Sequence, residues 1–203
     1  MDTWEPFVDG VDFGEGPRWH DGALWYSDFH QRAVYRVTAD GERTGVHTGL
    51  SDRPSGLGWL PDGTLLVVFM TSRRLMREAD DGELAEHADL SDVAAWHCND
   101  SVVAANGDAY VGYFGFDLES RAKFAPADLA LVRRDGTVTV AADGLRFPNG
   151  SVITPDGSTL IVGQSFGGDY VAFTIGDDGS LTDRRSWAEI PGTAPDGCTL
   201  DEA

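Results

Sequence analysis

A polar residue returns at a fixed place in a repeated sequence unit, and this repeat constrains the fold more than any other feature of the chain. We call these positions the slots; they are Glu15, Ser55, Asn99, Asn149 and Asp196. They lie 40 to 50 residues apart, and an Asp-Gly or Asn-Gly pair follows each of the first four after six or seven residues. Units that pack around an axis bring equivalent side chains to that axis. The repeat therefore predicts that these distant polar residues converge.

Each unit has the pattern of four antiparallel strands. Asp-Gly and Asn-Gly pairs tolerate the positive φ of tight hairpin turns, and apolar runs flank each pair. A third apolar run and a second Asp-Gly turn follow, and then a shorter fourth strand such as residues 137–140. The predicted turns begin at Asp21, Asp40, Asp62, Asp81, Asn106, Asp135, Asp156 and Asp178. Four strands in a unit of this length are typical of a β-propeller blade.

The whole chain fits this one repeat. Apolar residues show no sustained helical spacing, so we predict an all-β protein in which residues 1–203 form a single β-propeller domain of four-stranded antiparallel blades. Residues 83–86 are good helix formers, but a turn and an outer strand fit the repeat better. The sequence stops directly after the fifth slot, which predicts about four blades plus the start of a fifth. Such a domain would be truncated, incomplete at its C-terminus, because its last strands would leave an unpaired edge.

Charge and cysteine content restrict the partners. A net charge of −19 argues against nucleic acid, whose phosphates need a basic surface. The sequence shows no charged start with a long apolar run, so we expect no membrane span and no secretory signal. Its two cysteines, Cys98 and Cys198, form no metal or disulfide pattern. Reduced thiols are typical of a cytoplasmic protein, which is the location we expect. The oligomeric state cannot be predicted from the sequence.

The chemistry of the slots indicates a cation. In a propeller the innermost strands line the central channel, so Glu15, Asn149 and Asp196 would bring two carboxylates and one amide oxygen to its mouth. Hard oxygen donors suit Ca²⁺ or Mg²⁺ and accept Mn²⁺ or Zn²⁺. Taken alone, Asp196 in its Pro-Asp-Gly sequence fits an ordinary turn better than a metal ligand. Glu15, however, lies between Gly14 and Gly16, where a carboxylate has no role in forming a turn, and it shares the spacing of the other slots.

Several motifs together resemble the SMP-30/gluconolactonase/LRE family. They are residues 13–19 (FGEGPRW) with 24–28 (LWYSD), 54–57 (PSGL), 99–100 (ND), 147–150 (FPNG) with 154–157 (TPDG), and 194–197 (APDG). They cover the whole chain in the family's order and are specific as a set, although each is weak alone. The resemblance implies a six-bladed β-propeller with one divalent cation, Ca²⁺ first, at the channel mouth. It also implies hydrolysis of lactones, often sugar lactones.

The resemblance also implies roles for individual residues. Carried over by position, the metal ligands are Glu15, Asn149 and Asp196. The catalytic residues are Asp196, as the base that takes a proton from water, and Asn99, as a donor to the developing oxyanion. The bound cation would polarise the lactone carbonyl and activate the water, so no covalent nucleophile is required.

Substrate contacts are implied at His97, Asn99, Asp100 and Asp117. His97 stands where sugar-lactone hydrolases of this kind often carry an arginine. Its presence argues against a phosphorylated or strongly hydroxylated substrate.

A metal-dependent lactonase has three alternatives, of which phosphotriester or strictosidine-synthase-like chemistry shares the scaffold and is less favoured. A thiol or serine hydrolase is disfavoured, because His97 and Cys98 are adjacent on a predicted strand and point to opposite faces, and no Gly-x-Ser-x-Gly elbow occurs. A non-catalytic propeller whose cation stabilises the channel, and whose surface binds a partner, stays open. The pair Asn99 and Asp100 beside the slot favours an enzyme, since a structural cation needs no spare amide and carboxylate.

Overall fold

The computed structural model describes residues 5–201, and all of the regular structure in this range is β-strand. Sixteen strands form four sheets of four, each sheet built from strands that are consecutive in the chain. No helix within the described range is long and apolar enough to cross a membrane. The all-β prediction is confirmed.

The four sheets are antiparallel blades. The first contains β1 (Gly14–His20), β2 (Ala23–Asp28), β3 (Ala33–Thr38) and β4 (Arg43–His47). The second contains β5 (Pro54–Trp59), β6 (Leu65–Phe69), β7 (Arg74–Glu78) and β8 (Leu84–Asp89). The third contains β9 (Cys98–Val103), β10 (Ala109–Tyr113), β11 (Ala127–Val132) and β12 (Val138–Leu145). The fourth contains β13 (Pro148–Ile153), β14 (Thr159–Gln164), β15 (Asp169–Ile175) and β16 (Leu181–Glu189).

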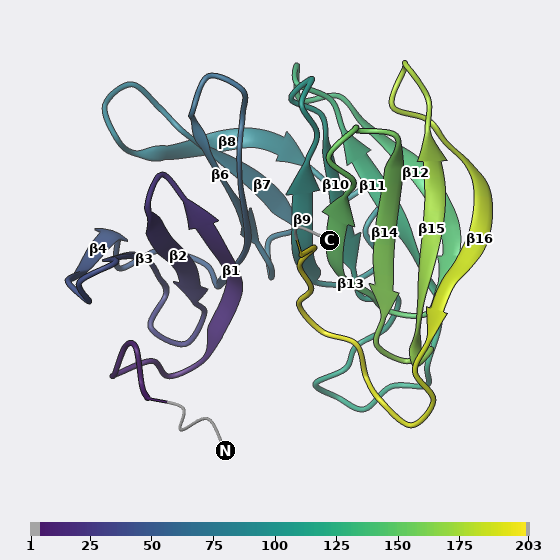
Figure 1. The fold of residues 1–203 in the computed structure, drawn as a ribbon, viewed down its shortest axis with the longest axis horizontal. Coiled ribbons are helices and arrows are strands. Elements are labelled where there is room, and N and C mark those ends of the chain that lie inside the picture. The colour runs from purple at the N-terminus through teal and green to yellow at the C-terminus, as the bar shows by residue number, and fades with distance from the viewer. Residues whose placement is uncertain (1–4, 202–203) are drawn as a thin grey trace.

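The blades follow one another around an axis lined by their first strands. β1 packs against β5, β5 against β9, and β9 against β13. Figure 1 shows β1, β9 and β13 toward the middle of the molecule, with β4 and β16 at its outer sides. The propeller prediction is therefore confirmed with four blades in the described range, whereas the six-bladed count stays a prediction.

The predicted Asp-Gly turns close the hairpins. Gly63 and Gly157 have φ of 87° and 73°, values that glycine adopts without a steric penalty. The aspartate before each glycine accepts a hydrogen bond from the backbone N–H two residues ahead, at 3.1 Å from Thr64 to Asp62 and at 3.1 Å from Ser158 to Asp156. Each of these two turns thus satisfies a backbone N–H of its own with an aspartate side chain.

Glycine after the slot allows the inner strands to approach closely. A Cβ at Gly56 would lie 2.6 Å from the backbone nitrogen of Ser101, and one at Gly16 would lie 2.8 Å from the carbonyl oxygen of Ser55. A Cβ at Gly150 would lie 2.3 Å from the carbonyl oxygen of Asp196. No side chain fits at these three positions without moving a neighbouring backbone.

The expected first strand of a fifth blade is not formed as a strand. Within the described range the chain after β16 is irregular up to residue 201. Figure 1 shows this yellow segment returning to the middle of the molecule beside β13. The backbone N–H of Gly150 donates to the carbonyl oxygen of Asp196 at 3.0 Å, but this single bond does not make a ladder. The fifth slot therefore has the predicted place and lacks the predicted strand.

The hydrophobic core lies between neighbouring sheets. Leu75, Val111 and Ala130 are fully buried in one cluster that joins the second and third blades. Leu129, Leu160 and other buried residues form a second cluster between the third and fourth blades. Burial of these side chains is what fixes one blade against the next.

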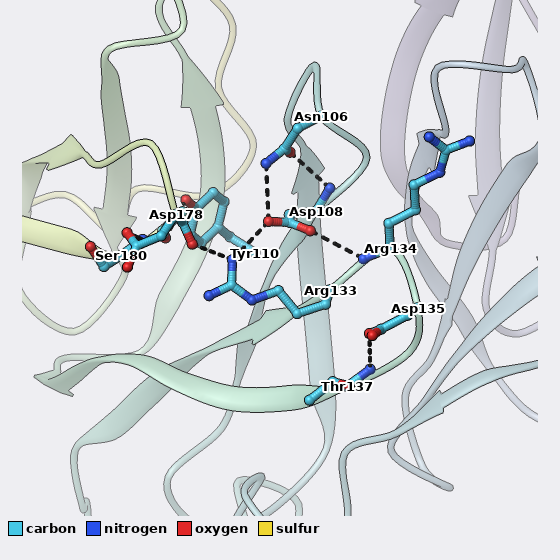
Figure 2. Close-up of polar contacts among 10 residues, drawn as sticks. Asn106, Asp108, Tyr110, Arg133, Arg134, Asp135, Thr137, Asp178 and Ser180 are labelled. Atoms are coloured by element: carbon cyan, nitrogen blue, oxygen red, sulfur yellow. Dashed lines mark hydrogen bonds and ion pairs between the residues drawn. The ribbon is translucent and has the colours of Figure 1, made fainter.

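A polar network joins the third and fourth blades at the end opposite to the slots. Figure 2 shows the Asp108 carboxylate accepting hydrogen bonds from Asn106 Nδ2 at 3.0 Å, Arg133 Nη1 at 2.9 Å and the backbone N–H of Arg134 at 3.1 Å. The Asp108 side chain is only 9% exposed. Tyr110 Oη donates to the carbonyl oxygen of Gly179 at 2.8 Å, across the blade boundary. Asp108 is therefore a buried charge that the surrounding donors stabilise.

We expect Asp108→Ala to lower the free energy of unfolding by about 1–3 kcal/mol, because the donors that Asp108 satisfies lose a buried acceptor. Urea unfolding followed by tryptophan fluorescence measures the loss. Asp135→Ala is the matched control: Asp135 is an exposed turn residue whose carboxylate accepts from the Thr137 N–H in the same region. An equal loss in both variants would contradict the role given to Asp108.

Candidate metal centre

Four of the five slots lie at the same place in their blades. Glu15, Ser55, Asn99 and Asn149 are each the second residue of an inner strand, β1, β5, β9 or β13. In all four inner strands the pairing with the next strand shifts at the slot, between Glu15 and Arg18 in β1 and, in the others, between the residue before the slot and the second residue after it. A bulge of this kind re-aims a side chain at the end of a sheet. The local structure thus presents the slots at one end of the axis.

The structure brings the three predicted metal ligands into one cavity. Glu15, Asn149 and Asp196 line a cavity of about 340 Å³, together with Phe13, Gly14, Gly16, Pro17, Asp100 and Gly197. Glu15 and Asp196 are separated by most of the chain, and only the blade repeat places them together. Their role as ligands stays a prediction, but the convergence on which it depends is present.

Hydrogen bonds orient the amide of Asn149. Its Nδ2 donates to Ser165 Oγ at 3.0 Å, and Ser165 Oγ donates to the carbonyl oxygen of Pro195 at 2.6 Å. This chain of donors directs the amide nitrogen toward Ser165 and turns the oxygen Oδ1 to the other side of the amide. The same hydrogen bonds connect Asn149, in the fourth blade, to the segment that carries Asp196.

The carboxylates in the cavity repel one another. Burial first, and then the neighbouring charges of Asp196 and Asp100, raise the pKa of Glu15 to about 7. Burial also raises the pKa of Asp100, against the opposing effect of the Arg18 guanidinium. Crowded, partly desolvated carboxylates of this kind are stabilised by a cation.

The donor set fits a hard divalent cation. Two carboxylates and an amide oxygen are the oxygen ligands that Ca²⁺ and Mg²⁺ take, with waters at the remaining positions. In the described part of the chain no three His, Cys, Asp or Glu side chains are placed to hold a metal by themselves. The amide oxygen of Asn149 is the third candidate donor in the cavity.

Arg18 is a residue of this site that the sequence reasoning missed. Its Nη2 lies 2.7 Å from Asp100 Oδ1 and 2.9 Å from the carbonyl oxygen of Ser101. It reaches from the first blade to the third, next to the cavity. The signal available in the sequence was the third unit itself, which has Asp100 where the other units have glycine after the slot.

The remaining predicted site residues are placed differently. His97 and Asp117 line a second cavity, of about 480 Å³, with Arg53, Trp96 and Glu119 among its other walls. His97 directly precedes β9, so this cavity lies at the same end of the blades as the slots. Asn99 lines neither cavity: it is 5% exposed, and its Oδ1 accepts a hydrogen bond from Ser55 Oγ at 3.5 Å. Of the predicted substrate contacts, only Asp100 shares the cavity of Glu15.

The thiols are not placed to act as nucleophiles. Burial raises the pKa of Cys98 to about 12 and that of Cys198 to about 11. Both groups therefore stay protonated at neutral pH, and a thiol mechanism is disfavoured by chemistry as well as by strand geometry.

The fold and the site define a β-propeller that presents carboxylate and amide side chains in a cavity at one end of its axis. The model of the SMP-30/Gluconolactonase/LRE-like region matches residues 13–203, and the chain belongs to this family. The family prediction made from the sequence motifs is confirmed.

Individual relatives agree with this assignment. The pentonolactonase XacC of Haloferax volcanii is 28% identical over 94% of this chain, which spans only 64% of the length of that relative. A gluconolactonase from Xanthomonas campestris is 28% identical with a TM-score of 0.78, covering 94% of this chain and 67% of that one. The calcium-binding protein regucalcin of Agrobacterium tumefaciens has a TM-score of 0.69 at 23% identity, over 86% of this chain and 58% of that one, and shows the fold alone.

We expect the cation-free protein to become more stable as the pH falls through about 7. The folded state holds a proton on Glu15 below this pH, whereas the unfolded state takes it up only near 4.5, so the stabilising effect is absent above pH 7 and complete below 4.5. Urea unfolding across this range in the presence of a chelator measures the effect. Glu15→Gln should remove the contribution of Glu15 to the pH dependence of the free energy of unfolding. Asp196→Asn should shift this contribution to lower pH. A slope that Glu15→Gln leaves unchanged would contradict the prediction.

Proposed function

We propose that the protein is a divalent-cation-dependent hydrolase that opens the ring of a small lactone, a sugar lactone or a similar cyclic ester. The observation that carries the proposal is the convergence of Glu15, Asn149 and Asp196 on one cavity. Family membership and the names of two relatives, a pentonolactonase and a gluconolactonase, support the reaction class. A cytoplasmic location belongs to the same proposal.

The cation would be held by Glu15, Asn149 and Asp196. Ca²⁺ is the first candidate because all three donors are hard oxygens, and Mg²⁺, Mn²⁺ or Zn²⁺ also fit. When bound, such a cation supplies Lewis-acid polarisation of the lactone carbonyl and lowers the pKa of a coordinated water.

The chain's own residues would handle the protons and the substrate. Asp196 accepts a proton from the attacking water as its oxygen bonds to the carbonyl carbon, and the ring C–O bond breaks to give a hydroxyl that takes up a proton. The Asn99 side-chain oxygen Oδ1 accepts a hydrogen bond from Ser55 Oγ, so the amide hydrogens of Asn99 point away from Ser55. Donation of these hydrogens to the developing oxyanion, after a small movement toward the cavity, is the role we propose for it.

The second cavity would bind the part of the lactone away from the reacting carbonyl. It lies at the slot end of the blades and is lined by His97 and Asp117. Burial lowers the pKa of His97, so its imidazole is neutral at neutral pH and forms hydrogen bonds rather than a strong ion pair. Such a cavity suits a neutral lactone better than a phosphorylated one.

We expect hydrolysis of aldonolactones or aliphatic lactones that is lost on complete removal of metal and restored by a divalent cation. Asp196→Ala, which removes both a ligand and the proton acceptor, should lower kcat/KM by at least about 10²-fold. A pH-stat assay over a lactone panel, with and without chelator, measures both effects.

Asp178→Asn is a matched control, because Asp178 is an exposed turn residue at the opposite end of the blades. It should retain full activity. Hydrolysis that survives metal removal or persists in Asp196→Ala would refute the mechanism. Cation binding without hydrolysis of any lactone would favour the alternative, a non-catalytic binding module.

A further inference from the structure

Arg18 and Asp100 each depart from the repeat, and they bind each other. The residue after the slot is glycine in the first, second and fourth units and aspartate only in the third. Three residues after the slot, the first unit has Arg18, and the others have Gly58, Val102 and Val152. Two departures from the repeat, 82 residues apart in sequence, thus form one ion pair between the first and third blades.

The ion pair alters the charge of the cation cavity. Asp100 lines the cavity with Glu15 and Asp196, and its side chain is only 9% exposed. Arg18 Nη2 lies 2.7 Å from Asp100 Oδ1, and the Arg18 side chain is itself 22% exposed. Three ionised carboxylates would give the cavity three negative charges. The guanidinium of Arg18 offsets the negative charge of Asp100, so the negative charges of Glu15 and Asp196 remain.

Cation selectivity depends on this balance. The Coulomb repulsion energy between a positive charge near the site and a bound cation is about 1.5 times larger for a trivalent ion than for a divalent ion at the same place. Partly buried charges are weakly screened, so the difference persists at ordinary ionic strength. Removing Arg18 would therefore favour trivalent ions, and removing Asp100 alone would favour divalent ones.

We propose that Arg18 is a positioning and charge-setting residue, which offsets the charge of Asp100 and so shifts the selectivity of the cavity toward divalent and away from trivalent cations of similar size. The inference rests on the proposed function only in requiring that the cavity binds a cation. It assigns no chemical step to Arg18, which touches neither Glu15 nor Asp196 in the described contacts.

Isothermal calorimetry with calcium chloride and terbium chloride tests the proposal at neutral pH. The quantity measured is the ratio of the Kd for Ca²⁺ to the Kd for Tb³⁺. We expect Arg18→Met to raise this ratio on the order of tenfold and Asp100→Asn to lower it by a similar factor. The double variant, which removes both charges, should return to within about twofold of the wild-type ratio.

Two controls separate charge from structure. Arg18→Lys keeps the positive charge and should keep the wild-type ratio. Arg133→Met removes the partner of Asp108, a second carboxylate with 9% side-chain exposure, at the far end of the blades. It should leave the ratio unchanged even if stability falls. A change as large in Arg133→Met as in Arg18→Met would overturn the proposal.

The result can be distinguished from the proposed function. An unchanged ratio in Arg18→Met, with chelator-sensitive hydrolysis in the wild type, would overturn this inference and leave the lactonase proposal intact. The expected ratios of Kd values, found in a protein that hydrolyses no lactone, would support this inference and overturn the lactonase proposal. Should Arg18→Met fail to fold because Asp100 is left unpaired, Asp100→Asn and the double variant decide the question. Absence of binding of both ions to the wild type would overturn the inference.

Discussion

The close approach of the inner strands is the constraint on which the rest of the structure depends. Gly16, Gly56 and Gly150 leave no room for a side chain, because the backbone of the next segment lies where a Cβ would be. Strands that pack this closely hold the slots at one level of the axis. Without the close approach of the inner strands, the carboxylates of Glu15 and Asp196 would not be held in one cavity.

Repulsion between carboxylates that lie close together lowers the stability of the folded protein. The carboxylates of Glu15, Asp100 and Asp196 lie in one small cavity, and burial together with the charges of Asp196 and Asp100 raises the pKa of Glu15 to about 7. A chain selected for stability alone would place apolar side chains here. Clusters of perturbed carboxylates in a cavity are typical of functional sites, and a cation is the ligand that relieves their repulsion.

The sequence predicted the fold well, because it is encoded locally. Each Asp-Gly turn and each apolar run is a short-range signal, and the structure has a strand at every predicted run of the first four units. The shared position of Glu15 and Asn149 followed from counting residues between slots. The second residue of an inner strand has the same place in every blade, so this part of the site could also be predicted.

Other features could not be predicted because they depend on contacts across the axis. The Arg18–Asp100 pair joins blades that are not adjacent, and the departure of Asp100 from the repeat does not by itself identify Arg18 as its partner. The separate cavity of His97 and Asp117, and the turn of Asn99 toward Ser55, depend on loop packing that residue spacing does not determine. The irregular segment around Asp196 was expected as a strand, because its motif resembles the earlier slots while its backbone makes one bond to β13.

The candidate oxygen ligands come from segments that are far apart in the described chain. During synthesis, Glu15 leaves the ribosome long before Asp196, so the cavity is incomplete until the segment around Asp196 has docked beside Gly150. An ion that binds only the assembled arrangement stabilises that arrangement by mass action. Occupancy of the cavity by a cation would then report that this segment has docked.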